Sequence, residues 1–140
     1  MYKKDMRKEI SVTARVWKDV PLEKGVFIHS LTDLLNDHID LSTYGKGVEE
    51  FNFTAIIEPD NFFPDKFRYS GKCKRVDIEW RMPYRKVLST PTDVFKGQLA
   101  RAYLGAIDEI IKSNISGFDA LRFRKDVEDL FEKQGWLAYA

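Results

Sequence analysis

Hydrophobic and polar positions alternate most regularly over residues 72–82, which predicts a β-strand with one buried face. Successive side chains of a strand point to opposite sides. One side therefore carries Val76, Ile78, Trp80 and Met82, and the other carries charged residues. An apolar face that includes a tryptophan needs a covering layer. We expect this strand to lie at the centre of the fold, with helices packed against it.

The same alternation predicts three further strands, at residues 10–17, 48–57 and 66–69. Ser70 and Gly71 favour a tight turn after the last of these, which predicts an antiparallel hairpin with the strand at 72–82. Two prolines break regular structure before this hairpin, and we expect Phe62 and Phe63 to tuck under the edge of the sheet.

A first helix is predicted over residues 22–38, with Asp19 as its N-cap and Pro21 near its first turn. Apolar side chains recur along it at the spacing of a helix with one buried face: Leu22, Val26, Leu31, Leu34 and Leu35. Residues 40–47, which contain serine, threonine and two glycines, are predicted to form a loop.

A long amphipathic helix is predicted at residues 92–112, with Thr90 as N-cap and Asp93 completing a capping box. Small side chains on this helix are expected to permit close approach of a neighbouring layer: Ala102, Gly105 and Ala106. A last helix is predicted to begin after Asp119 as its N-cap and to end before Gly135.

The resulting order β-α-β-β-β-α-α predicts an α+β fold, in which three helices cover mainly one face of an antiparallel sheet of about four strands. The length of 140 residues is that of one ordinary domain, so we expect a single domain over residues 1–140. A single cysteine, Cys73, excludes an internal disulfide framework, and no run approaches the about 18–20 apolar residues of a membrane span. We expect a cytoplasmic protein without cofactor or metal.

Residues that suggest catalysis are few. The two histidines, His29 and His38, are nine positions apart on one predicted helix and point to nearly opposite sides, so they cannot share a metal ion. His29 and Asp33 are four positions apart, and a small enzyme that uses this pair for acid–base chemistry is one alternative hypothesis. The chain contains neither a phosphate-binding glycine loop nor a G-x-S-x-G nucleophile motif.

Charge is distributed unevenly, although the net charge of the chain is only +1. Residues 19–60 contain nine acidic and two basic residues, whereas residues 66–86 contain eight basic and two acidic residues. Two interpretations are open. The segments could neutralise each other within the fold, or the acidic segment could form an exposed surface that selects a basic protein partner.

The basic hairpin 66–86 supports a second alternative hypothesis, the binding of single-stranded nucleic acid. Phe67 and Tyr69 could stack on bases while lysines contact phosphates. A spacing of two is also the pattern of one face of a strand, and the balanced net charge does not indicate a polyanionic partner. We therefore do not favour nucleic acid as the partner.

The chain contains the segments EISVTARV, YGKGVEEFNFTAII, RYSGKCKRVDIEWRM and FDALRFRKDVEDLF. In order and spacing they resemble the immunity proteins of bacterial polymorphic-toxin and contact-dependent growth-inhibition systems, most closely immunity protein 44. The resemblance covers most of the chain. It implies a non-enzymatic α+β protein that binds one cognate toxin domain in the cytoplasm and blocks its active site or substrate-binding surface. Many such toxins are nucleases, whose substrate surfaces are basic.

Charge and expected exposure, rather than any family motif, indicate where such a partner would bind. The candidate residues are Asp33, Asp37, Asp40, Tyr44, Glu49 and Glu50. Tyr44 is the candidate anchor, because an aromatic side chain in a loop can be buried by a partner.

Overall fold

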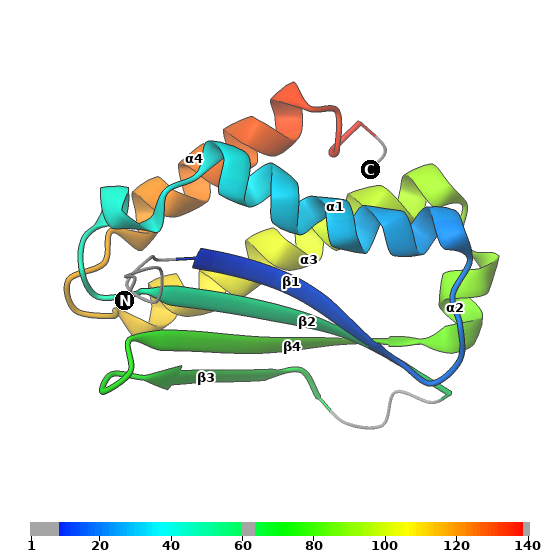
Figure 1. Cartoon of the computed structure of the whole chain (residues 1–140), viewed down its shortest axis with the longest axis horizontal. Helices are drawn as coiled ribbons and strands as arrows, with labels where there is room; N and C mark the ends of the chain where they lie inside the picture. The colour runs from blue at the N-terminus through cyan, green and yellow to red at the C-terminus, as the bar shows by residue number, and fades with distance from the viewer. Residues whose placement is uncertain (1–8, 60–63, 139–140) are drawn as a thin grey trace, which may run out of the picture.

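The computed structural model describes residues 9–59 and 64–138, and its strands and longer helices follow the predicted order (Figure 1). The elements are β1 (Glu9–Val16), α1 (Leu22–His38), the 3-10 helix η2 (Leu41–Tyr44), β2 (Glu50–Glu58), β3 (Lys66–Ser70), β4 (Arg75–Pro83), α2 (Tyr84–Ser89), α3 (Thr92–Ser113) and α4 (Ala120–Lys133). The α+β class is confirmed. The sequence did not predict η2 and α2, because elements so short show no clear periodicity. Phe62 and Phe63 lie outside the described residues.

The four strands form one mixed sheet in the order β1-β2-β4-β3. β1 is parallel to β2 and β2 to β4, whereas β3 and β4 form the predicted antiparallel hairpin. The prediction of an entirely antiparallel sheet is wrong. α1 carries the chain back along the sheet between β1 and β2, and a helical crossover of this kind joins parallel strands.

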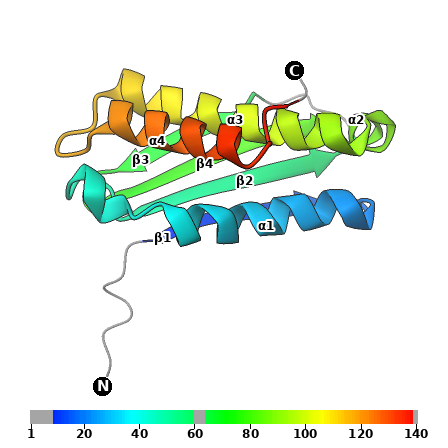
Figure 2. The same cartoon turned by 90° about the horizontal axis from the view of Figure 1, so that it is seen from above.

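One face of the sheet carries the hydrophobic core. Four side chains of β2 point into it, each at most 1% exposed: Phe51, Phe53, Ala55 and Ile57. α3 and α4 lie on this side of the sheet (Figure 2). The ring of Tyr103 in α3 has its centroid 5.2 Å from that of Phe51 and 5.4 Å from that of Phe53. No described helix covers the opposite, polar face, so the helices pack mainly on one face as predicted.

α1 lies along the outer edge of β1 and hydrogen bonds to backbone groups that an edge strand would otherwise leave unpaired. Thr32 Oγ1 accepts from the Val12 N–H and donates to the Val12 carbonyl, both at 2.9 Å. Asn36 Oδ1 accepts from the Ile10 N–H at 3.1 Å, and Asn36 Nδ2 donates to the Ile10 carbonyl at 2.7 Å. These bonds close this edge of the sheet to further strand pairing.

Replacing Thr32 by valine is expected to lower the free energy of unfolding by about 1–2 kcal/mol, because both backbone groups of Val12 lose a partner. Thr13→Val is the matched control. The Thr13 hydroxyl makes an exposed 3.3 Å contact with that of Thr54, so we expect a change within about 0.5 kcal/mol. Urea denaturation measures both changes. Equal losses in the two variants would contradict the role of Thr32 at the edge.

The predicted apolar stripe of α1 is wrong in its first half, because Leu22 and Leu31 are nine positions apart and therefore lie on nearly opposite sides of a helix. Leu22 and Val26, predicted to face the core, are 81% and 51% exposed, whereas Lys24 is 4% exposed. Lys24 shares the helix face of the buried Ile28 and Leu31. Its Nζ donates a 2.6 Å hydrogen bond to the carbonyl of Val87, in the last turn of α2, where helix carbonyls lack intrahelical partners. The rest of the predicted apolar stripe is buried or partly buried: Leu31, Leu34 and Leu35.

Only one of the three predicted N-caps is confirmed. α1 begins without a side-chain cap, so the prediction for Asp19 is wrong. Thr90 does not cap α3, because its hydroxyl donates to the carbonyl of Lys86 at the end of α2, at 2.6 Å. Asp119 does cap α4, and its carboxylate accepts from the N–H of Arg122 at 3.1 Å.

Candidate protein-binding surface

The outward face of α1 presents a row of exposed side chains. A helix has about 3.6 residues per turn, so positions separated by three and four residues fall on one face. The row, called the α1 stripe below, consists of Leu22, Val26, His29, Asp33 and Asp37. Its first two members are apolar and its last two are acidic, so the stripe changes from apolar to negatively charged along the helix.

The predicted acidic residues differ in how far they are engaged within the fold. Asp33, Asp37 and Glu49 are exposed, and their side chains make no ion pair or hydrogen bond within residues 9–59 and 64–138. Asp40 Oδ1 accepts from the backbone N–H of Ser42 at 2.9 Å and so caps η2. These positions therefore remain candidates, and Asp33, Asp37 and Glu49 have the least constrained side chains among them.

The basic residues of β4 are held mainly by acids of their own strand. Arg75 Nε lies 3.1 Å from Asp77 Oδ1, and Arg81 Nη2 lies 2.8 Å from Glu79 Oε1. Longer contacts connect the basic and acidic segments: Glu50–Arg75 at 3.7 Å and Glu58–Arg81 at 3.6 Å. Neither contact involves the acids of the α1 stripe. Internal neutralisation thus applies to Glu50 and Glu58, while the acidic half of the stripe faces solvent.

The expected exposure of Tyr44 is wrong, because the side chain is only 5% exposed. Its hydroxyl donates a 2.7 Å hydrogen bond to Asp126 Oδ2, and its ring packs near Phe118 and Phe123. The loop that contains Tyr44 pairs with the loop between α3 and α4, where the Asp119 N–H donates to the Tyr44 carbonyl at 2.8 Å. Tyr44 therefore packs against α4 and the loop before it, and its side chain is not available to anchor a partner.

The Tyr44 hydroxyl makes stability depend on pH at the alkaline end. Burial, and after it the hydrogen bond to Asp126, raises the pKa of Tyr44 above its ordinary value of 10.0. The unfolded chain therefore ionises first, so this stabilisation is fully present below about pH 10 and is lost as the pH rises further. We expect the free energy of unfolding to fall more steeply between about pH 9.5 and 11.5 in the native protein than in Tyr44→Phe. Urea denaturation across this range measures the slopes, and equal slopes would contradict the assignment.

A depression of about 410 Å³ lies beside the apolar half of the α1 stripe, between α1 and the end of β1. Its lining is mostly apolar and includes Ala14, Val16, Val20, Leu22 and Ile28. Val16 is 42% exposed, and Trp17, the next residue, is 53% exposed. Exposed apolar surface of this kind is typical of protein-binding sites. The predicted apolar stripe misses it because it groups Leu22 and Val26 with Leu31 and Leu35, although each pair nine positions apart lies on nearly opposite sides of the helix.

The structure gives little support to the alternative sites. No hydrogen bond joins His29 to Asp33, and among the described residues no three His, Cys, Asp or Glu side chains are arranged to hold a metal ion. Phe67 and Tyr69 pack against the core, and the Tyr69 hydroxyl donates to the Gly47 carbonyl at 3.0 Å. These rings are therefore not free to stack on bases. None of the described helices is long and apolar enough to cross a membrane.

The apolar-to-acidic row on α1 is a candidate surface for binding another protein. Comparison with known proteins defines the class of protein. The model of the family described as immunity protein 44 matches residues 8–133, and the chain belongs to this family. Membership confirms the resemblance found in the sequence and implies an immunity protein whose partner is a toxin. No curated protein and no solved structure matches the chain.

Proposed function

We propose that the α1 stripe is the surface through which this immunity protein binds its toxin and covers the toxin's active or substrate-binding surface. The observation that carries the proposal is that Asp33 and Asp37 are exposed without an ionic partner in the described chain, in line with the exposed Leu22 and Val26. The protein has no catalytic role of its own in this proposal, and it acts in the bacterial cytoplasm.

The two halves of the stripe suit different aspects of binding. Acidic side chains attract a positively charged partner and accelerate its association. A toxin that acts on nucleic acid is such a partner, because the surface that binds its substrate is basic. Apolar side chains that a partner covers slow dissociation, because apolar area is removed from water. A toxin with a basic surface beside an apolar patch fits this arrangement, and a nuclease would supply the basic surface.

Truncation of Leu22 tests the proposal with little risk to the fold, because this side chain is 81% exposed. We expect Leu22→Ala to weaken binding of the cognate toxin domain by about fivefold or more, and to weaken inhibition of the toxin in parallel. Leu121→Ala is the matched control, because Leu121 is 70% exposed on α4. Titration calorimetry measures both affinities. Unchanged affinity in Leu22→Ala, or equal losses in both variants, would place the interface elsewhere.

A further inference from the structure

The two edges of the sheet differ in whether their outward backbone groups have hydrogen-bond partners. α1 closes the β1 edge through Thr32 and Asn36. At the other edge, no described residue outside β4 hydrogen bonds to the backbone of β3 (Lys66–Ser70). An uncovered edge strand offers its outward N–H and C=O groups to another extended chain.

The strand register identifies which groups face outward. The Arg81 N–H points toward the β3 side of β4, because it donates to Asp65 Oδ1 at 2.7 Å. Backbone groups alternate in direction along a strand, so Glu79, Asp77 and Arg75 also face β3, opposite Lys66, Arg68 and Ser70. The backbone groups of the two intervening residues of β3, Phe67 and Tyr69, therefore point away from the sheet.

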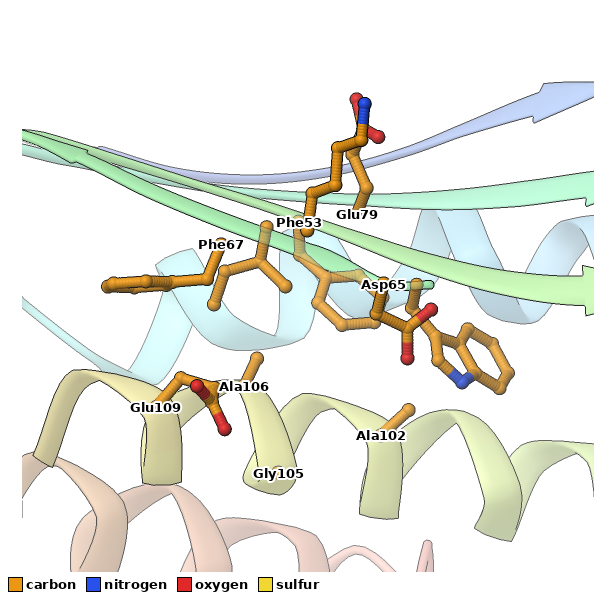
Figure 3. A pocket seen from close by; sticks show the side chains of 11 residues that line it. Phe53, Asp65, Phe67, Glu79, Ala102, Gly105, Ala106 and Glu109 are labelled. Atoms are coloured by element: carbon orange, nitrogen blue, oxygen red, sulfur yellow. The ribbon is translucent and has the colours of Figure 1, made fainter. Parts of the chain in front are cut away.

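An open groove of about 410 Å³ adjoins this edge, between the sheet and α3, and its lining is mostly apolar but includes the acidic Asp65 and Glu109 (Figure 3). Its sheet side is formed by Phe53, Phe67, Ile78 and Trp80. Its α3 side is formed by Ala102, Gly105 and Ala106, and a Cβ added at Gly105 would meet no atom within 4 Å. The small residues of α3, predicted to permit close packing, leave space at Gly105 instead. This space can hold an apolar side chain from outside.

The charges along β3 distinguish between possible occupants. Lys66 and Arg68 are exposed on the polar face of the sheet, opposite the face that carries the groove, and they have no ion pair within the described chain. In a second copy of this protein, antiparallel pairing about Phe67 or about Arg68 would place basic residues opposite one another, which is unfavourable. An extended segment with apolar residues on one face and acidic residues on the other matches both the groove and the charges.

We infer that the β3 edge accepts an extended segment of the toxin as an additional strand, with an apolar side chain in the groove and acidic side chains beside Lys66 and Arg68. The inference takes the toxin as partner from the proposed function but does not depend on the α1 stripe. The β1 and β3 edges lie at opposite ends of the strand order, so a toxin that binds the α1 stripe would reach the β3 edge with an arm or tail.

Amide hydrogen exchange followed by NMR tests this directly, with the full chain alone and bound to the purified toxin domain. We expect exchange at Phe67 and Tyr69 to be fast in the free protein and at least about tenfold slower in the complex. The Arg68 amide faces β4 and serves as the internal control. A complex without added protection at Phe67 and Tyr69 would overturn this inference alone. The absence of any complex would overturn the proposed function and this inference with it. Slower exchange at Phe67 and Tyr69 as the concentration of the free protein rises would identify a second copy as the occupant, and this result would also overturn the inference.

Paired variants separate the backbone contribution from that of the side chain. Phe67→Ala and Phe67→Pro both remove the ring, but only proline removes the outward N–H, and edge strands tolerate proline at such positions. We expect Phe67→Pro to bind the toxin about tenfold more weakly than Phe67→Ala. Gly105→Phe, which fills the groove from α3, should weaken binding to a similar extent, and it keeps the test valid if Phe67→Pro does not fold. Equal affinity of the two Phe67 variants, or native affinity of Gly105→Phe, would contradict the inference.

Discussion

Replacing Asp33 and Asp37 together by lysine is expected to slow association with the toxin about tenfold or more at low salt. Both carboxylates are exposed and have no ionic partner in the described chain, so their reversal changes the field that a basic partner meets without breaking an internal contact. The dissociation rate constant should change less than the association rate constant, and the difference from the native protein should shrink as salt is added. Stopped-flow or surface-plasmon measurements at several salt concentrations give both constants.

The control for this prediction is Asp93→Lys with Glu132→Lys, which changes the net charge by the same amount on α3 and α4. Its association rate constant should stay within about threefold of the native value, since the charges lie on other helices and are not part of the α1 stripe. Equal slowing by both double variants would show that net charge, rather than the stripe, controls association. A change confined to dissociation would indicate that the acids make buried contacts instead of attracting the partner.

Alanine substitutions at two glycines are expected to change stability in opposite directions. Gly47→Ala should lower the free energy of unfolding by about 1–3 kcal/mol. The Gly47 N–H donates to the Gly117 carbonyl at 2.9 Å, and a Cβ on residue 47 would overlap the carbonyl oxygen of Ser116. The loop that contains Gly47 and the loop that contains Ser116 and Gly117 meet through their backbones, so neither can relieve the overlap by rotating a side chain.

Gly105→Ala is the counterpart in this prediction. A Cβ at this position meets nothing within 4 Å, and alanine is the better helix former, so stability should rise by about 0.5–1 kcal/mol. Urea denaturation of the three proteins gives the signs. Unchanged stability of Gly47→Ala would contradict the close approach of the two loops.

The sequence predicted those parts of the fold that follow from local periodicity. The alternation in β2 and β4 identifies most of the buried residues, although Ile56 on the polar face is also buried and Trp80 is only partly buried. The helical pattern predicts the bounds of α1 as observed. The direction of the strands was not predicted correctly. The turn at Ser70 and Gly71 predicts the antiparallel hairpin of β3 and β4 from local sequence. The parallel pairing of β2 with β4 is not local, because β3 comes between them in the sequence but lies at the edge of the sheet.

The candidate site was predicted only in part, because exposure depends on tertiary contacts. Asp33 and Asp37 lie on the outward face, as their charge indicates. The apolar half of the stripe was wrongly assigned to the core. Leu22 lies nine positions from the buried Leu31, so the helical period itself places Leu22 on the outward side. The burial of Tyr44 could not be predicted, because its loop pairs with a loop more than seventy positions further along the chain.

A crystal structure of this protein with its toxin domain would test the central claim most directly. We expect Leu22 and Val26 to be covered by the toxin, and the carboxylates of Asp33 and Asp37 to lie within about 4 Å of lysine or arginine side chains of the toxin. A complex in which the toxin binds another surface and the α1 stripe stays in solvent would contradict this account.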